Sequence, residues 1–150
     1  MRLKSMSHTK LKVSPYGIRL FALADDCTVV METDEGTLTW VILEGFVTDF
    51  RSPRGIVGDL VDFVIPNAGP IDQAVCYLVH DSNYSTMADG QHPVSRAVAD
   101  ELLCQSLKLA GLSDVKCDLV YEAVRALGES PYEEATEWGN SAKFNFEWEA

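Results

Sequence analysis

The chain has 150 residues, 47% of them hydrophobic, and its 23 acidic and 12 basic side chains give a formal net charge of −11. This composition is that of an ordinary globular domain and excludes disordered, collagen-like and low-complexity chains. The acidity argues against nucleic-acid binding, which depends on Lys and Arg to neutralise phosphates. No apolar run reaches the roughly 18–20 residues of a transmembrane helix, so we expect no transmembrane segment.

The first half of the chain is predicted to form β-strands. Apolar, β-branched and aromatic residues predict strands at residues 18–23, 27–32 and 37–43, and the turn sequence at residues 33–36 predicts a hairpin between the last two. Residues 45–50 continue as a short extended segment. Pro53 then ends this segment, because proline lacks a backbone donor.

The second half is predicted to form helices at residues 54–64, 70–84, 93 or 95 to 110, and 114–127. Pro70 suits a first helical position, Ser113 suits an N-cap, and Gly111 and Gly128 are typical helix stops. Strands followed by helices indicate an α+β fold. We therefore expect a small antiparallel sheet from the N-terminal half, packed with three to four α-helices from the C-terminal half.

The two ends of the chain differ in charge from the predicted domain at residues 18–128. The first 20 residues contain five basic and no acidic side chains, whereas residues 129–150 contain six acidic side chains and one lysine. Phe144, Phe146 and Trp148 alternate with polar residues, which indicates a short strand or an interaction segment. We expect a basic N-terminal arm at residues 1–17 and an acidic, aromatic C-terminal tail at residues 129–150, either solvated or docked on an oppositely charged neighbour.

The four cysteines give no sign of a metal site or a disulfide framework. None of them belongs to a C-x-x-C pair, and no signal-peptide-like segment begins the chain. We expect them to be structural thiols, because free cysteine behaves as a small buried hydrophobe.

Three polar clusters carry residues suited to chemistry. They are Thr48, Asp49 and Ser52 at a strand end, His80, Asp81 and Tyr84 late on a helix, and Arg96 and Asp100 at the start of the next helix. Two antiparallel helices joined by a loop bring the end of one beside the start of the next. His80 and Asp100 are therefore expected to meet.

An imidazole held by a carboxylate is the pair that a general base requires, because the carboxylate selects the tautomer and stabilises the imidazolium. Tyr84 and Arg96 would complete this catalytic group, with Thr48, Asp49 and Ser52 as substrate or loop residues. Asp81, with Asp49 or backbone carbonyls, would form an oxygen site for a hard cation. The alternative is a satisfied polar network that only sets the register of packed helices.

The motifs also occur in a characteristic order. They are Gly45-Phe46-Val47-Thr48-Asp49-Phe50 with Ser52-Pro53, then His80-Asp81-x-x-Tyr84, Arg96-x-x-Ala99-Asp100, and Tyr121-x-Ala123-Val124-Arg125-x-x-Gly128. This order resembles an uncharacterised family of phages and prophages, a domain of unknown function. The resemblance covers residues 18–128 and implies a phage origin without an established activity.

The His80 motif with a later-helix aspartate also resembles the active-site helix pair of secreted and prokaryotic phospholipases A2. That resemblance implies that His80 is the base that activates water, that Asp81 binds calcium, and that Asp100 orients the histidine, with Tyr84 beside them. The glycine-rich calcium loop and the flanking disulfide cysteines of those enzymes, Cys76 apart, are missing here.

Three functions from different classes remain open. The first is a phage-encoded accessory protein acting as a metal-assisted hydrolase on an ester, amide or cell-envelope bond, with Ca²⁺ or another divalent cation as cofactor. The second is a virion structural or assembly component of the tail or neck, whose polar cluster is purely structural. The third and weakest is an acidic inhibitor that imitates nucleic acid.

The expected partners are further copies of the chain or other phage proteins, bound through residues 1–17 and 129–150. The expected location is the host cytoplasm on synthesis, with the virion as a second location.

Overall fold

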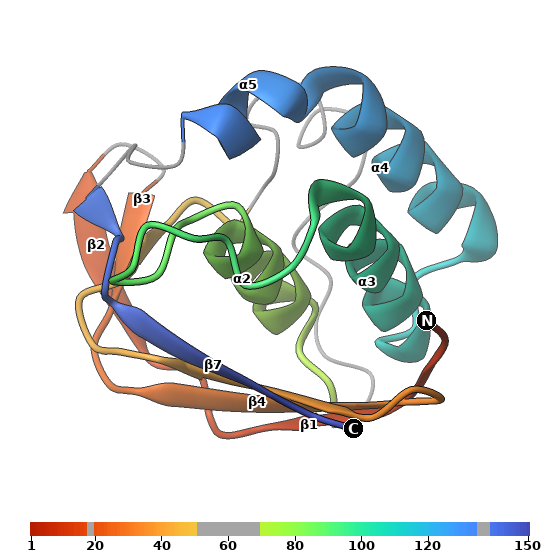
Figure 1. The fold of residues 1–150 in the computed structure, drawn as a ribbon, viewed down its shortest axis with the longest axis horizontal. Helices are drawn as coiled ribbons and strands as arrows, with labels where there is room; N and C mark the ends of the chain where they lie inside the picture. Colours follow the sequence, from red (N-terminus) through yellow and green to blue (C-terminus); the bar gives the residue numbers. More distant parts are fainter. Residues whose placement is uncertain (18–19, 51–69, 135–138) are drawn as a thin grey trace.

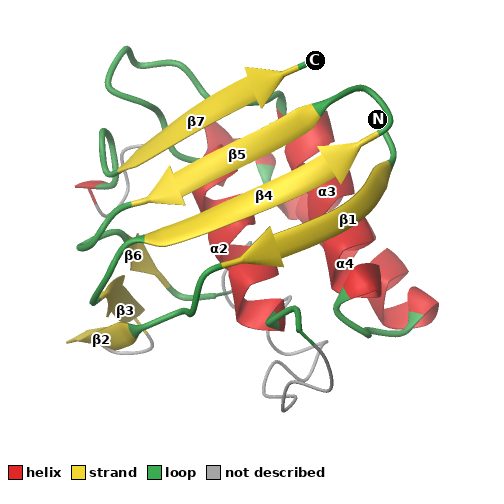
Figure 2. Ribbon diagram, turned by 90° about the horizontal axis from the view of Figure 1, so that it is seen from below, coloured by secondary structure: helices red, strands yellow, loops and turns green. Residues whose placement is uncertain are grey.

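A computed structural model describes residues 1–17, 20–50, 70–134 and 139–150, and shows an α+β fold with antiparallel sheets (Figure 1). The helices lie on one side of the larger sheet, and Figure 2 shows the opposite face of that sheet without a covering layer. The predicted fold class is confirmed. The helix predicted at residues 54–64 and the candidate residue Ser52 lie outside the described residues.

The larger sheet contains four strands in the order β1-β4-β5-β7. Their bounds are β1 Leu3–His8, β4 Cys27–Thr33, β5 Thr37–Ile42 and β7 Phe144–Glu149. The predicted hairpin joins β4 to β5. Gly36 lies in its turn with φ 149°, and a Cβ there would come within 2.5 Å of the Glu149 carbonyl oxygen. The turn therefore requires glycine both for its backbone conformation and for the close approach of the C-terminal strand.

A second, three-stranded sheet has the order β2-β3-β6. It is formed by β2 Val13–Gly17, β3 Leu20–Leu23 and β6 Val47–Thr48. The extended segment predicted at residues 45–50 is thus a strand of only two residues. The side chain of Asn140 donates to the Val47 carbonyl and accepts from the Val47 amide, both at 2.8 Å, so an amide group takes the place of the next strand.

The described helices are α2 Gln73–Asn83, α3 Arg96–Leu109, α4 Asp114–Leu127 and α5 Glu129–Glu133. Asp72, Ser95 and Ser113 cap the first three with side-chain oxygens that accept from backbone amides. The start predicted for α2 at residue 70 is therefore three residues too early, because Asp72 provides the cap. Among the described residues, no helix combines the length and apolarity needed to cross a membrane.

Both terminal segments contribute strands to the larger sheet. Leu3–His8 forms one edge and Phe144–Glu149 forms the other, and the two ends of the chain lie at the same end of the sheet (Figure 2). Leu3 and Phe144 are buried with the core. Residues 1–17 and 129–150 therefore do not form only an arm and a tail outside the domain, because each supplies an edge strand that covers core side chains.

The hydrophobic core lies between the four-stranded sheet and the helices. Alternate residues of β4 and β5 are buried, among them Met31, Leu38 and Trp40, and they face α2 and α3. The Trp40 indole donates to Asn83 Oδ1 at 2.8 Å, which attaches β5 to the end of α2. This attachment, together with the core packing, places the polar residues of α2 beside those of α3.

Candidate functional site

His80 and Asp100 are in direct contact across the α2–α3 pair. His80 Nε2 lies 2.8 Å from Asp100 Oδ1, and the two residues are 1% and 0% exposed. The antiparallel helices bring these side chains together, as their spacing predicted. We call this group, with the side chains of Tyr84, Arg96 and Arg125 that surround Asp100, the Asp100 cluster.

Asp100 accepts hydrogen bonds from more than one helix. The Tyr84 hydroxyl donates to Oδ1 at 2.7 Å, and Arg125 of α4 donates to Oδ2 at 2.9 Å. Burial by itself raises the pKa of Asp100, but the hydrogen bonds from His80, Tyr84 and Arg125 outweigh burial and hold this pKa below its ordinary value. The carboxylate is therefore ionised at neutral pH and connects three helices.

Arg96 lies between Asp100 and the C-terminal end of α4. Its guanidinium lies 3.7 Å from Asp100 Oδ2 and donates to the carbonyl oxygens of Val124 and Arg125 at 3.1 to 3.3 Å. Both carbonyls belong to the last turn of α4. The Val124 carbonyl also accepts from the Gly128 amide at 2.9 Å, so Arg96 is its second donor. Arg96 thus caps the C-terminus of α4 and orients Arg125 toward Asp100.

Gly128 leaves the space that the Tyr84 ring occupies. A Cβ at Gly128 would lie 2.4 Å from the Tyr84 hydroxyl oxygen and 2.4 Å from the Val124 carbonyl oxygen. Its backbone is right-handed, with φ −85°. Glycine is required here by the close approach of Tyr84 rather than by backbone conformation.

The second ring nitrogen of His80 has no partner among the described residues. Nδ1 is buried and makes no hydrogen bond within that part of the chain. Because the ionised Asp100 carboxylate only accepts, the proton of a neutral His80 resides on Nε2, and Nδ1 presents its lone pair. An unsatisfied buried acceptor costs about 1–3 kcal/mol and calls for a functional explanation.

The strand-end residues lie beside the next residue of α2. Thr48 donates its hydroxyl to Asp81 Oδ2 and accepts from the Phe50 amide, and Thr48, Asp49 and Asp81 are all buried. Phe50 has φ 57°, which is uncommon for a residue other than glycine. Strained backbone of this kind is concentrated at functional sites. β6 and α2 thus form a second polar contact, one residue from His80.

The carboxylates of Asp49 and Asp81 are the oxygen ligands that the sequence offers for a cation. Within the described part of the chain, no group of three or more His, Cys, Asp or Glu side chains is arranged to hold a metal ion.

An aromatic stack covers the Tyr84 side of the Asp100 cluster. The rings of His80 and Tyr84 are 4.2 Å apart, Tyr132 of α5 meets Tyr84 edge-on at 5.3 Å, and His92 stacks on Tyr132 at 3.7 Å. His92 Nδ1 donates to the carbonyl oxygens of Asn83 and Ser85. His92, in the loop after α2, therefore belongs to the aromatic cover over Tyr84.

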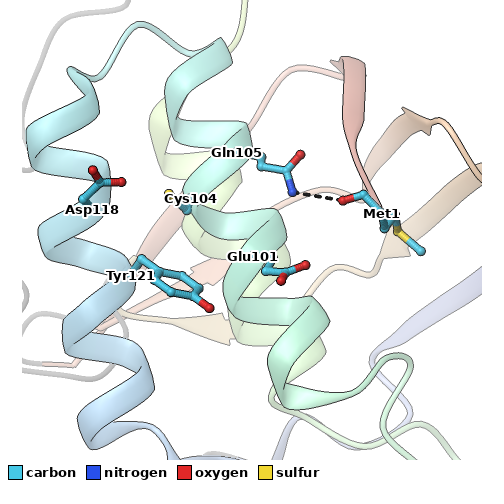
Figure 3. A pocket seen from close by; sticks show the side chains of 6 residues that line it. All are labelled: Met1, Glu101, Cys104, Gln105, Asp118 and Tyr121. Carbon is cyan, nitrogen blue, oxygen red and sulfur yellow. Dashed lines mark hydrogen bonds between the residues drawn. The ribbon is translucent and has the colours of Figure 1, made fainter.

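Two surface pockets lie away from the cluster. One, of about 430 Å³, lies between α3, α4 and the N-terminal residue and is lined by Glu101, Asp118, Tyr121 and three neighbours (Figure 3). The other, of about 560 Å³, runs beside β7. Neither pocket is lined by His80, Asp100 or Tyr84.

Most of the chain matches one protein family. A family model described as a protein of unknown function, DUF1353, matches residues 21–124. The chain belongs to the DUF1353 family. The comparisons with curated proteins and with solved structures found no match. The DUF1353 match contains the strand-end segment, His80 and Asp100, but it ends one residue before Arg125.

The sequence assigned no role to Arg125, Tyr132 or Asn140, and it assigned Gly128 only the role of a helix stop. For Arg125 and Gly128 a signal was present, because Arg125-x-x-Gly128 forms the last of the ordered motifs. Tyr132 and Asn140 follow the matched segment, and no spacing connects either one to the residue it contacts.

Proposed function

We propose that this protein is a hydrolase, encoded by a phage or prophage, in which His80 acts as a general base oriented by Asp100. The observation that supports the proposal is the buried Nδ1 of His80, which carries a lone pair and has no described partner, opposite an Nε2 held by an ionised carboxylate. Nδ1 removes a proton from water as the water oxygen bonds to the electrophilic atom of an ester, amide or cell-envelope bond. The scissile bond then breaks, and the imidazolium returns the proton to the leaving group. Asp100 stabilises this imidazolium.

The positive groups of the cluster act on Asp100 rather than on substrate. Arg125 and Tyr84 hold the carboxylate in one orientation, and Arg96 holds Arg125 through the end of α4. Asp81 is held by Thr48, and a divalent cation such as Ca²⁺ would bind there with Asp49. Since His80 is only 1% exposed, the reaction requires the aromatic cover of Tyr84, Tyr132 and His92 to open.

The experiment uses three substrates: a p-nitrophenyl ester, a chromogenic peptide amide and purified bacterial cell walls. His80→Gln is expected to lower turnover by about 10²–10⁴-fold, the usual contribution of a general base. His8→Gln is the matched control, because His8 caps the start of α2 through the Asp72 amide and does not contact Asp100. Turnover by His80→Gln equal to that of the wild type, or no turnover of any substrate by the wild type, would contradict the proposal.

The protonation state of His80 can be measured without a substrate. Long-range ¹H–¹⁵N spectra of the neutral ring are expected to show the proton on Nε2 and a bare Nδ1. A proton on Nδ1 would remove the lone pair on which the proposal rests.

The second candidate function is that of a virion structural or assembly component. The observation that favours it is the burial of His80, Tyr84 and Asp100, because a network joining α2, α3 and α4 fixes their register without chemistry. This function predicts that the protein is present in purified particles. It also predicts that His80→Gln leaves the phage viable wherever the fold is retained.

A further inference from the structure

We propose that two copies of this chain associate through the outer edge of β7, forming one continuous eight-stranded sheet with a two-fold axis at Phe146. This inference is independent of the proposed hydrolase. It starts from the backbone groups that each sheet edge exposes, because an unpaired edge strand is a template for another strand.

On the other two long outer edges that the structure describes, a side-chain contact or a proline interrupts the row of backbone groups. On β1, the Gln105 side chain accepts from the Leu3 amide at 2.7 Å and donates to the Met1 carbonyl at 3.2 Å. On β2, the Ala24 amide donates to the Lys12 carbonyl, so Lys12 faces β3. Pro15 therefore faces outward by alternation, and the outer edge of β2 lacks a donor there.

The β7 edge has no such block. The Leu43 amide donates to the Lys143 carbonyl, so alternate residues from 143 to 149 bond β5. The amides and carbonyls of Phe144, Phe146 and Trp148 consequently point away from the sheet, and the described residues offer them no hydrogen-bond partner. The strand contains neither proline nor glycine, and Trp148 is 43% exposed.

Charge and side-chain pairing select a second copy as the partner. A two-fold axis at Phe146 pairs the residues whose backbone groups point away from the sheet. Phe144 of one copy then lies opposite Trp148 of the other, and the two copies of Phe146 lie opposite each other. The same axis also places Lys143 opposite Glu149 and Asn145 opposite Glu147, so no like charges meet. Moving the axis to Glu147 would oppose two carboxylates, and moving it to Asn145 would shorten the ladder.

The pocket beside β7 provides room for this contact. It measures about 560 Å³, and Met87, Phe144 and Phe146 are among its lining residues. The side chains of Phe144, Phe146 and Trp148 lie on the face of the sheet that carries the helices, as shown by the contact of Phe146 with the Trp40 ring at 5.3 Å. In the proposed pairing, Trp148 of the second copy lies opposite Phe144 and enters this pocket.

The test is the mass in solution of the full chain, measured by light scattering and sedimentation over a range of concentrations. The wild type is expected to have twice the mass of one chain. Trp148→Pro removes an outward-facing backbone donor together with the indole and leaves the backbone bonds to β5, so it should raise the dimer dissociation constant about tenfold or more. Trp148→Lys, which keeps the backbone donor and removes the indole, should weaken the dimer as well.

Val115→Lys is the matched control, because Val115 is 72% exposed on α4, away from β7, and its replacement should leave the mass unchanged. A wild type that is monomeric at every concentration, or a Trp148→Pro dimer as stable as that of the wild type, would overturn the proposal.

The register has its own test. The Asn145→Cys/Glu147→Cys variant should form a disulfide-linked dimer on oxidation, whereas Asn145→Cys/Glu149→Cys should not. The reverse result would overturn the axis at Phe146.

Discussion

Replacing Gly128 with alanine places a methyl group against the hydroxyl that Tyr84 donates to Asp100. The new Cβ would lie 2.4 Å from that hydroxyl oxygen and 3.2 Å from Tyr84 Cε2, so the ring must move. Overpacking costs roughly 1–3 kcal/mol, and a lost hydrogen bond to a charged acceptor costs about 1.5–3 kcal/mol. Alanine also makes the unfolded chain less flexible, which stabilises the folded state by about 0.4–1 kcal/mol. This gain applies at Gly128 because its φ of −85° is one that alanine adopts without strain.

The net loss of unfolding free energy for Gly128→Ala is therefore about 1.5–5.5 kcal/mol. Urea denaturation followed by circular dichroism measures it, in the wild-type background and in Tyr84→Phe. Tyr84→Phe lacks the hydroxyl that makes most of the clash and donates to Asp100. In that background, Gly128→Ala should therefore lower the free energy of unfolding by about 1–3 kcal/mol less than in the wild type. The remainder comes from the Val124 carbonyl oxygen, which also lies 2.4 Å from the new Cβ.

Gly111→Ala is the control for this cycle. Gly111 has φ 96° and open space around its Cβ position, so alanine there adds backbone strain without touching Tyr84. Its cost should be the same in both backgrounds. A Gly128→Ala variant within about 0.5 kcal/mol of the wild type, or an equal cost of that change with and without the Tyr84 hydroxyl, would refute the reasoning.

Two further predictions concern buried titratable groups. Asp100→Asn should lower the free energy of unfolding by about 3 kcal/mol, the lower end for breaking a buried ion pair, because Arg125 keeps 34% of its side chain exposed and can be hydrated. Since the pKa of Asp100 is lowered in the folded state, its contribution is present above the unfolded pKa of about 4 and is lost as the pH falls through the folded pKa. The wild type should therefore lose stability below pH 4 more steeply than Asp100→Asn in acid titrations, and parallel curves would contradict this. Burial raises the pKa of Cys76 and of Cys117 to about 12. Because the thiolate is the reactive form, neither cysteine should react with iodoacetamide at pH 8 before the protein unfolds. Mass spectrometry of the digested protein measures this, and modification of either cysteine in the folded protein would contradict the prediction.

The helix pair carrying His80 and Asp100 was predictable because its signals are local. Pro70 marks the approach to the first helix, Ser95 caps the second, and apolar residues recur at helical spacing along each. A short loop between two such helices forces them to be antiparallel neighbours, which brings His80 to Asp100. The contact was therefore predicted from spacing alone, although its closed environment was not.

The strands of the N-terminal segment were missed for an equally physical reason. Val13–Gly17 is exposed at every position, so it shows no alternation, and a bulge interrupts the register of β1 between Leu3 and Ser5. Charge was the only pattern these residues displayed, and charge distinguishes an arm from a strand poorly. The alternation of Phe144, Phe146 and Trp148 did indicate a strand, but not the sheet that it joins.

The sequence by itself determined the α+β class, the central hairpin, the N-cap of α4 and the meeting of His80 with Asp100. These features depend on periodicity, turn chemistry and caps, each of which acts over a few residues. Only the tertiary structure decided that Arg125 shares Asp100, that Gly128 makes room for Tyr84, and that Asn140 completes the sheet beside Thr48. It alone placed both ends of the chain at the edges of one sheet. Most of those contacts join residues 25 to 102 positions apart in the sequence, and the contact at Gly128 depends on how closely the Tyr84 side chain approaches. These distances are set only when the helices pack on the sheet.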